Sequence, residues 1–194
     1  DYVHTLVEAK KLAFEDRAKY YVDMDFADVP VETLISKAYA DERRKLISPD
    51  AASRSLPAGD AMLEDGDTIY LTVADRDGNM VSITYTLNAG YGSKLVVDGA
   101  GFLLNNEMDD FSVKPGVPNI YGLVGAEANK IEPGKRMLSS MSPTLVLKDG
   151  EPVMVVGAPG GGKIITVVAQ AILNFARFGL SPAENVSQPR VHHQ

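Results

Sequence analysis

Two strands joined by a tight turn over residues 67–88 constrain the fold of this chain more than any other stretch. β-branched and aromatic residues fill both arms, and Asp77-Gly78-Asn79 supplies the turn. Because successive side chains of a strand point to opposite faces, Ile69, Leu71 and Val73 share an apolar face, which we expect to lie against a core. The other face carries hydroxyls and an amide, from Thr68, Tyr70, Thr72, Thr84, Thr86 and Asn88.

This polar face has two interpretations. The pattern alone favours a solvated surface, because threonine is a good strand former in any case. The alternative is a polar wall of an active site.

Helices are predicted at both ends of the chain, and further strands between them. Apolar residues at helical spacing predict a helix over residues 2–20, and Pro30 opens a second one that runs to about Leu46. The other expected elements are short strands at 95–97 and 102–104, a second hairpin from 143–147 and 152–156, an apolar helix over 164–178 and a helix that starts at 181–185. Strands flanked by apolar helices predict a layered α/β or α+β domain.

Length and composition exclude several classes of protein. The chain has 194 residues, enough for one domain with a core, and its net charge of −7 disfavours nucleic acid and anionic membranes as partners. The absence of cysteine excludes disulfides, thiolate metal sites and a cysteine nucleophile. No stretch has the length and hydropathy of a membrane span, and no signal peptide opens the chain. Because position 1 is Asp, the sequence is compatible with an internal piece of a longer protein.

A long stretch of small and acidic residues lies directly before the first strand. It runs from 48 to 67 and is interrupted by Pro49, Pro57 and Gly59. This composition predicts a linker or exposed loop, and a loop of that length inside a compact domain is usually functional or disordered.

A glycine-rich turn over Gly157–Lys163 stands between a predicted strand and a predicted helix. It is close to a phosphate-binding loop, but that motif needs Ser or Thr after the lysine and this chain has Ile164. A second interpretation is a packing turn, in which glycines let a strand and a helix approach closely. A third is an oxyanion hole, because glycine amides before a helix can point at one developing negative charge.

Three other groups of residues are chemical candidates. The first is an acidic cluster formed by Glu107, Asp109 and Asp110. Three interpretations of this cluster are a solvated turn, a metal site and a binding site for the ammonium group of a substrate. Ser139-Ser140 forms a local hydroxyl–backbone turn or supplies donors to a carboxylate. His192 and His193 are adjacent and make a poor metal pair, and with His4 they are the only histidines.

Several of these stretches together resemble the γ-glutamyltranspeptidase family. The resemblance runs from about residue 65 to the last residue. Its most specific motifs are Thr84-Tyr85-Thr86-Leu87-Asn88, Leu104-Asn105-Asn106-Glu107-Met108-Asp109-Asp110-Phe111, Lys114-Pro115-Gly116-Val117-Pro118-Asn119, Leu138-Ser139-Ser140-Met141-Ser142-Pro143-Thr144 and Pro159-Gly160-Gly161. Residues 1–67 are similar to the end of the large subunit of that family, and 68–194 to most of its small subunit.

The resemblance implies an N-terminal-nucleophile hydrolase of α+β class, with part of an αββα sandwich, that cuts itself between Asp67 and Thr68. A threonine hydroxyl needs a nearby base to act as a nucleophile. The cut would free the α-amino group of Thr68, whose pKa is about 8, and this amine could take the hydroxyl proton.

The resemblance also assigns roles to the other residues of the site. It implies that Thr86 orients the Thr68 hydroxyl, and that the amides of Gly160 and Gly161 form the oxyanion hole. The remaining residues would bind the γ-glutamyl donor, with Asn88, Glu107 and Asp110 at its α-amino group, Ser139 and Ser140 at its α-carboxylate, and Tyr121 on a lid loop.

The expected reaction is γ-glutamyl transfer from glutathione or a similar amide to water or an amino acid, without a cofactor or metal. The expected partner is the remaining large-subunit segment, and the expected location is the periplasm or the outside of the cell.

The sequence departs from the family pattern at three places. Ile69-Tyr70 follows Thr68, whereas many members have Thr-His there. Lys163 stands where the family more often has Ser followed by Arg. The large-subunit core, with the arginine expected to bind the substrate carboxylate, is absent from this sequence. Two other functions therefore stay open, a catalytically incomplete fragment or relative that acts as an assembly partner, and a nucleotide-binding module built on Gly157–Lys163.

Overall fold

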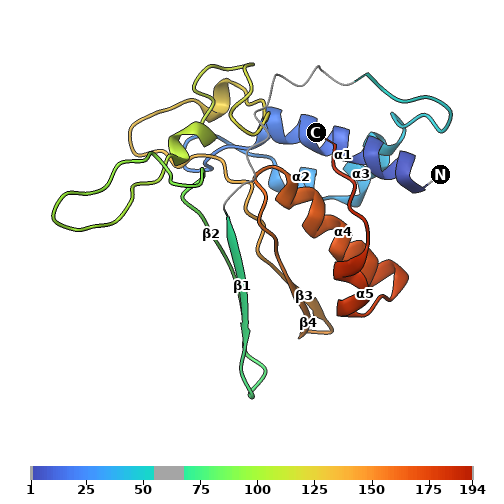
Figure 1. Ribbon diagram of the computed structural model, residues 1–194. Helices are drawn as coiled ribbons and strands as arrows, with labels where there is room; N and C mark the ends of the chain where they lie inside the picture. Colours follow the sequence, from blue (N-terminus) through green and yellow to red (C-terminus); the bar gives the residue numbers. More distant parts are fainter. Residues whose placement is uncertain (1, 55–67, 194) are drawn as a thin grey trace. The chain divides into compact units, whose positions relative to one another are not determined.

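The computed structural model describes residues 2–54 and 68–193, which form two compact units (Figure 1). Among the described residues, the first unit is built from 2–54, 108–139 and 193, and the second from 68–107 and 140–192. Most of the predicted linker at 48–67, and with it Asp67, lies outside the described residues. The predicted boundary between 67 and 68 refers to the subunits after cleavage and stays a prediction.

Helices dominate the first unit. The predicted N-terminal helix is α1 (Tyr2–Tyr20), but the single helix predicted over 30–46 is wrong, because the structure has α2 (Val31–Leu34) and α3 (Lys37–Arg44). The interruption has a local cause: the Ser36 hydroxyl accepts a hydrogen bond from the Tyr39 amide and caps a new helix. Short 3-10 turns, η1 (Glu107–Asp110) and η2 (Glu127–Asn129), follow later in the chain.

Polar contacts join α1 to α3. The Tyr39 hydroxyl donates to Asp16 over 3.0 Å, and the Arg43 guanidinium donates to Glu15 over 2.8 Å and to the Leu12 carbonyl over 3.0 Å. Since α3 is strongly polar and has no buried residue, these contacts rather than an apolar seam hold it against α1.

Two antiparallel hairpins form the sheets of the second unit. The first pairs β1 (Ile69–Ala74) with β2 (Met80–Tyr85) in the register Ile69↔Tyr85 to Ala74↔Met80. Its turn is the predicted one, and the Asp75 carboxylate accepts hydrogen bonds from the Asp77 and Asn79 amides, both over 2.9 Å. The second hairpin pairs β3 (Thr144–Lys148) with β4 (Glu151–Val156).

The C-terminal helices of the second unit agree with the sequence prediction. Helix α4 (Lys163–Phe178) ends at Gly179, whose φ of 67° is left-handed, and α5 (Pro182–Ser187) starts at a capping box formed by Ser181 and Glu184. Ala158, Ile164 and Val168 form the buried core beneath α4. None of the described helices has the length and hydropathy required for a membrane span.

The predicted strands at 95–97 and 102–104 are present only as an isolated bridge between Val96 and Leu103. The two segments run antiparallel, with a hydrogen bond of 2.8 Å from the Val97 amide to the Phe102 carbonyl. Left-handed glycines at Gly99 and Gly101 turn the chain between them, which leaves too few extended residues for a regular ladder.

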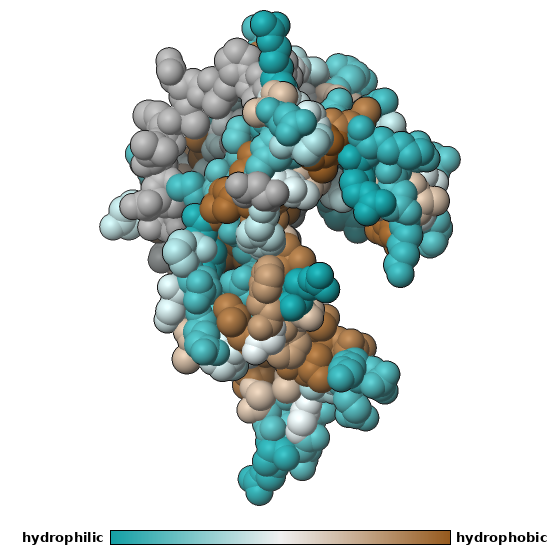
Figure 2. All heavy atoms as spheres, turned by 90° about the vertical axis from the view of Figure 1, so that its right-hand side faces the viewer, coloured by the Kyte–Doolittle hydropathy of each residue, from teal (hydrophilic) through white to brown (hydrophobic). Residues whose placement is uncertain are grey.

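The apolar face of the β1–β2 hairpin does not lie in a core, contrary to the sequence expectation. Ile69, Leu71 and Val73 are 58%, 41% and 56% exposed, and their cross-strand partners Tyr85, Ile83 and Val81 are exposed as well. Figure 2 shows hydrophobic side chains at the molecular surface. The alternation predicts correctly which side chains share a face, but burial requires a covering layer, and none of the described elements supplies one.

Candidate active site

Thr68 and Thr86 lie opposite each other at the open end of the first hairpin. Thr68 directly precedes β1 and Thr86 directly follows β2, so the ladder that pairs Ile69 with Tyr85 brings the two threonines together. The Thr68 hydroxyl donates a hydrogen bond of 3.2 Å to the Thr86 hydroxyl. Both residues are partly buried, so this contact lies in a site of restricted access to water.

Asn88 fixes the hydroxyl of Thr86 from the other side. Its amide N–H donates to Thr86 Oγ1 over 2.9 Å, and its φ of 77° is a left-handed conformation that asparagine tolerates. The side chain is buried and donates to the Asn106 carbonyl over 3.2 Å, while Asn106 Oδ1 accepts from the Ala89 amide over 2.9 Å. Thr86 therefore has a defined donor in Asn88 and a defined position next to Thr68.

The turn between β4 and α4 carries backbone donors at the start of a helix, with Gly160 partly buried and Gly161 buried. Gly160 and Gly161 have φ values of 124° and 54°, and the amides of Lys163 and Ile164 bond to the carbonyls of Gly160 and Gly161. Among the backbone hydrogen bonds of the described residues, none is donated by the amides of Gly160 and Gly161. Free N–H groups beside the positive end of a helix dipole suit a developing negative charge, as an oxyanion hole requires.

Tyr70 connects the strand that follows Thr68 to this glycine-rich turn. A Cβ at Gly157 would lie 2.1 Å from the Tyr70 ring, so only glycine fits there. The Tyr70 hydroxyl bonds to Ser82 Oγ over 3.0 Å and accepts from Thr72 Oγ1 over 2.6 Å. Ser82 in turn donates to the Val156 carbonyl over 3.4 Å, so part of the polar face of the hairpin is a hydroxyl network directed at β4.

We expect Gly157→Ala to lower the free energy of unfolding by about 3 kcal/mol, the upper part of the range for overpacked sites, because the new methyl group overlaps the Tyr70 ring. Thermal and denaturant unfolding measure the change. Gly157→Ala combined with Tyr70→Phe keeps the ring and should stay destabilised, whereas the combination with Tyr70→Ser should recover most of the loss. Equal stability of the two double variants would contradict a steric cause.

Asp110 belongs to the first unit and lies at the end of η1. Its Oδ1 accepts a long hydrogen bond of 3.4 Å from Asn119 Nδ2. Asn119 Oδ1 accepts from the amides of Tyr121 and Leu123, each over 3.0 Å. Asn119 thus joins the Asp110 carboxylate to the segment that carries Tyr121, which the sequence predicted as a lid loop.

Arg17 of α1 is a charged neighbour of Asp110 that the sequence did not reveal. Its side chain is buried, and burial lowers the pKa of its guanidinium, while the negative charge of Asp110 raises it. The charge of the Asp110 carboxylate therefore acts on a buried cation within the first unit.

The chain passes from the first unit to the second between Ser139 and Ser140. Ser140 is buried, and its carbonyl accepts from Ser142 Oγ over 3.1 Å. Glu107 lies in the second unit, where its amide donates to Asn105 Oδ1 over 3.0 Å. The predicted residues are thus divided between the units, with Asp110, Tyr121 and Ser139 in the first and Thr68, Thr86, Asn88, Glu107, Ser140, Gly160 and Gly161 in the second.

The acidic cluster has structural partners. Asp109 Oδ2 accepts from the Ile120 amide over 3.1 Å. No group of three or more acidic or histidine side chains with the geometry of a metal site occurs among the described residues. His192, the other metal candidate in the sequence, bonds through Nδ1 to Thr166 Oγ1 over 2.9 Å.

Three asparagines with structural roles at the site, Asn106, Asn119 and Asn129, were not assigned roles from the sequence. The side chains of Asn106 and Asn129 bond to backbone groups 17 and 19 residues away, whereas that of Asn119 accepts from the nearby Tyr121 amide. The only signal in the sequence is that each is an asparagine in a stretch without regular secondary structure. Ordinary turn residues give the same signal, so it does not distinguish these three.

Comparison with known proteins gives one consistent family. A family model described as Gamma-glutamyltranspeptidase matches residues 1–194. The glutathione hydrolase proenzyme of Escherichia coli is 48% identical over 197 residues, covering 100% of this chain and 34% of that protein. The glutathione hydrolase proenzyme of Pseudomonas aeruginosa is 51% identical over 193 residues, with the same two coverages. This chain therefore spans about a third of the length of these relatives.

A solved structure gives the same result for the fold. A mutant of Helicobacter pylori γ-glutamyltranspeptidase superposes with a TM-score of 0.63 and 62% sequence identity, covering 64% of this chain and 67% of that chain. The predicted α+β fold class of the N-terminal-nucleophile hydrolases is confirmed by this similarity.

Proposed function

We propose γ-glutamyl transfer and hydrolysis as the activity of this chain, which belongs to the γ-glutamyltranspeptidase family. The observation that carries the proposal is the hydrogen bond between the hydroxyls of Thr68 and Thr86 at the start of β1. The family match then favours this activity over a nucleotide-binding module at Gly157–Lys163.

Cleavage between Asp67 and Thr68 would create the catalytic group. While the peptide bond is intact, the Thr68 nitrogen is an amide and cannot accept a proton. After cleavage it is an amine with a pKa of about 8, so it can take the proton of its own hydroxyl near neutral pH. Thr86 would hold that hydroxyl in place before and after the cut.

The transfer reaction then has two halves. Thr68 Oγ1 bonds to the γ-carbonyl carbon of the donor, and the proton of the Thr68 hydroxyl passes to the α-amino group of Thr68. The Gly160 and Gly161 amides stabilise the oxyanion that forms. The proton then passes to the leaving amine as the carbon–nitrogen bond breaks, which leaves an ester on Thr68. Water or an amino acid attacks this ester and regenerates the hydroxyl, and no cofactor or metal takes part in either half.

Donor recognition uses the opposite charges of the γ-glutamyl unit. We assign its α-ammonium group to Asn88, Glu107 and Asp110, because carboxylates and an amide oxygen are acceptors for such a cation. We assign its α-carboxylate to the hydroxyls of Ser139 and Ser140, and the cover over the donor to Tyr121. Glutathione, which carries this unit, is the proposed donor.

The exposed apolar face of the first hairpin indicates a protein partner. Ile69, Leu71 and Val73 are half exposed although they alternate as core residues do. We propose that the remaining large-subunit segment covers this face. Each square ångström of apolar surface that it removes from water would contribute about 25 cal/mol to the stability of the assembly. A periplasmic or secreted location is also proposed, and it depends on the family alone.

Mass spectrometry of the complete gene product, combined with release of a chromophore from a γ-glutamyl anilide, tests the proposal. We expect two polypeptides, the second of which begins with Thr68, and chromophore release that an amino-acid acceptor accelerates. An assembly partner without catalytic activity would show the cleavage and no release. Mg²⁺-dependent nucleotide binding that Lys163→Ala removes would instead favour the nucleotide-binding alternative.

A further inference from the structure

Asn129 occupies a buried position between two of the proposed donor-binding segments, all within the first unit. Its side chain is 4% exposed, and Nδ2 donates a hydrogen bond of 2.8 Å to the Asp110 carbonyl. Its Oδ1 accepts from the Leu138 amide over 3.3 Å, directly before Ser139. One amide group therefore bonds to the backbone of both segments.

The backbone of Asn129 adds a third attachment. Its carbonyl accepts from the Ser112 amide over 2.9 Å, so the residues on both sides of Phe111 bond to Asn129. Phe111 is itself buried at 5% exposure, which leaves this stretch little freedom to move. A Cβ at Gly125 would lie 2.1 Å from Ser112 Oγ, so the chain around Asn129 is also closely packed.

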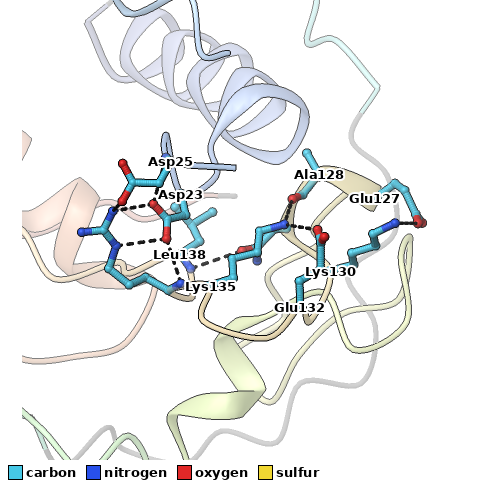
Figure 3. A network of polar contacts seen from close by, with 10 residues as sticks. Asp23, Asp25, Glu127, Ala128, Lys130, Glu132, Lys135 and Leu138 are labelled. Carbon is cyan, nitrogen blue, oxygen red and sulfur yellow. Dashed lines mark hydrogen bonds and ion pairs between the residues drawn. The ribbon is translucent and has the colours of Figure 1, made fainter. Parts of the chain in front are cut away.

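The segment before Ser139 is held at further points, which Figure 3 shows as a network of polar contacts. The Arg136 guanidinium donates to both carboxylate oxygens of Asp23, over 3.0 and 2.6 Å, and the Asp23 side chain is 1% exposed. These hydrogen bonds hold the pKa of the Asp23 carboxyl well below its usual range. Lys135 Nζ donates to the Ala128 carbonyl over 2.6 Å, next to Asn129.

We propose that Asn129 is a positioning residue that fixes the distance between Asp110, which binds the α-ammonium group of the donor, and Ser139, which binds its α-carboxylate. This role rests on the proposed function. A donor with both charged groups binds well only when both partners stand at the correct separation. A ligand with one of the two groups does not need that separation.

The chemistry of the position requires an amide. Asparagine offers a donor and an acceptor on one rigid group, and the two backbone partners here are an acceptor and a donor. Aspartate has the same shape but two acceptors, so it would place an oxygen against the Asp110 carbonyl. Alanine would remove both of these hydrogen bonds from the partly buried backbone of the two segments.

Competitive inhibition constants of three acids test the role in the complete, self-cleaved gene product. L-Glutamate carries both charged groups, glutarate lacks the amino group, and 4-aminobutyrate lacks the α-carboxylate. We expect Asn129→Asp and Asn129→Ala each to raise the inhibition constant of L-glutamate about tenfold, the typical effect of a lost buried hydrogen bond, and those of the other two acids less than twofold. Glu127→Gln is the matched control in the same turn and should change none of them, because its ion pair with Lys130 is exposed.

Each other outcome overturns the role. An equal rise for all three acids would mean that Asn129 only supports the fold, and no rise for L-glutamate would mean that it does not position the donor groups. An inhibition constant does not depend on the fraction of folded protein, and Asn129→Asp, which keeps the volume, carries the test if Asn129→Ala does not fold. A wild-type protein that neither cleaves itself nor binds L-glutamate would contradict the proposed function and this role together.

Discussion

Replacing Thr68 with alanine is expected to abolish cleavage at Asp67 and to lower γ-glutamyl transfer by at least about 10⁴-fold, as removal of a nucleophile does in other acyl-transfer enzymes. Alanine has no hydroxyl to attack the donor. The residue also cannot attack the preceding peptide bond, so the amine that would act as the base is never released. Gel analysis shows the uncut chain, and chromophore release from a γ-glutamyl anilide gives the loss of rate.

Two further variants separate the nucleophile from its surroundings. Thr68→Ser keeps a hydroxyl and should keep cleavage and measurable transfer. Thr72→Ala removes the same chemical group from the same strand face, where the hydroxyl bonds only to Tyr70 among the described residues, and should keep cleavage. Normal cleavage and transfer in Thr68→Ala would remove Thr68 from the reaction.

The end of the first hairpin that carries Thr68 and Thr86 could be predicted from sequence because local rules determine its geometry. Alternation sets which side chains share a face, and the turn at Asp77-Gly78-Asn79 sets the register. Together they place Thr68 opposite Thr86, where the two hydroxyls are 3.2 Å apart. The helix after the glycine-rich turn follows from equally local signals, apolar spacing and a C-terminal glycine.

The other parts of the fold and of the candidate site depend on contacts between residues distant in the sequence. Arg136 and Asp23 are 113 residues apart, and no local pattern links them. Asn129 reads as a turn residue, and only the fold shows that its amide bonds to two separate segments. The apolar face of β1 shows the same limit, because alternation identifies the face but not whether another part of the protein covers it.

Asp110→Asn is expected to weaken binding of γ-glutamyl donors about 100-fold, or roughly 3 kcal/mol, the upper part of the range for a hydrogen bond to a charged group. The change keeps the shape of the side chain and removes the negative charge that we assign to the α-ammonium group. The KM of a γ-glutamyl anilide and the inhibition constant of L-glutamate measure the effect. Asp28→Asn removes the same charge from an exposed position of the first unit and should change neither constant.

Arg17 separates two effects of this substitution, because its guanidinium interacts with the charge of Asp110 but has no proposed role in the reaction. Its buried guanidinium loses the favourable field of Asp110 in the variant, so the first unit should also become less stable. A loss of stability alone would lower the amount of active protein and leave the inhibition constants of L-glutamate and glutarate unchanged. Weaker binding of L-glutamate with unchanged binding of glutarate, which has no amino group, would instead assign the charge of Asp110 to the ammonium group of the donor.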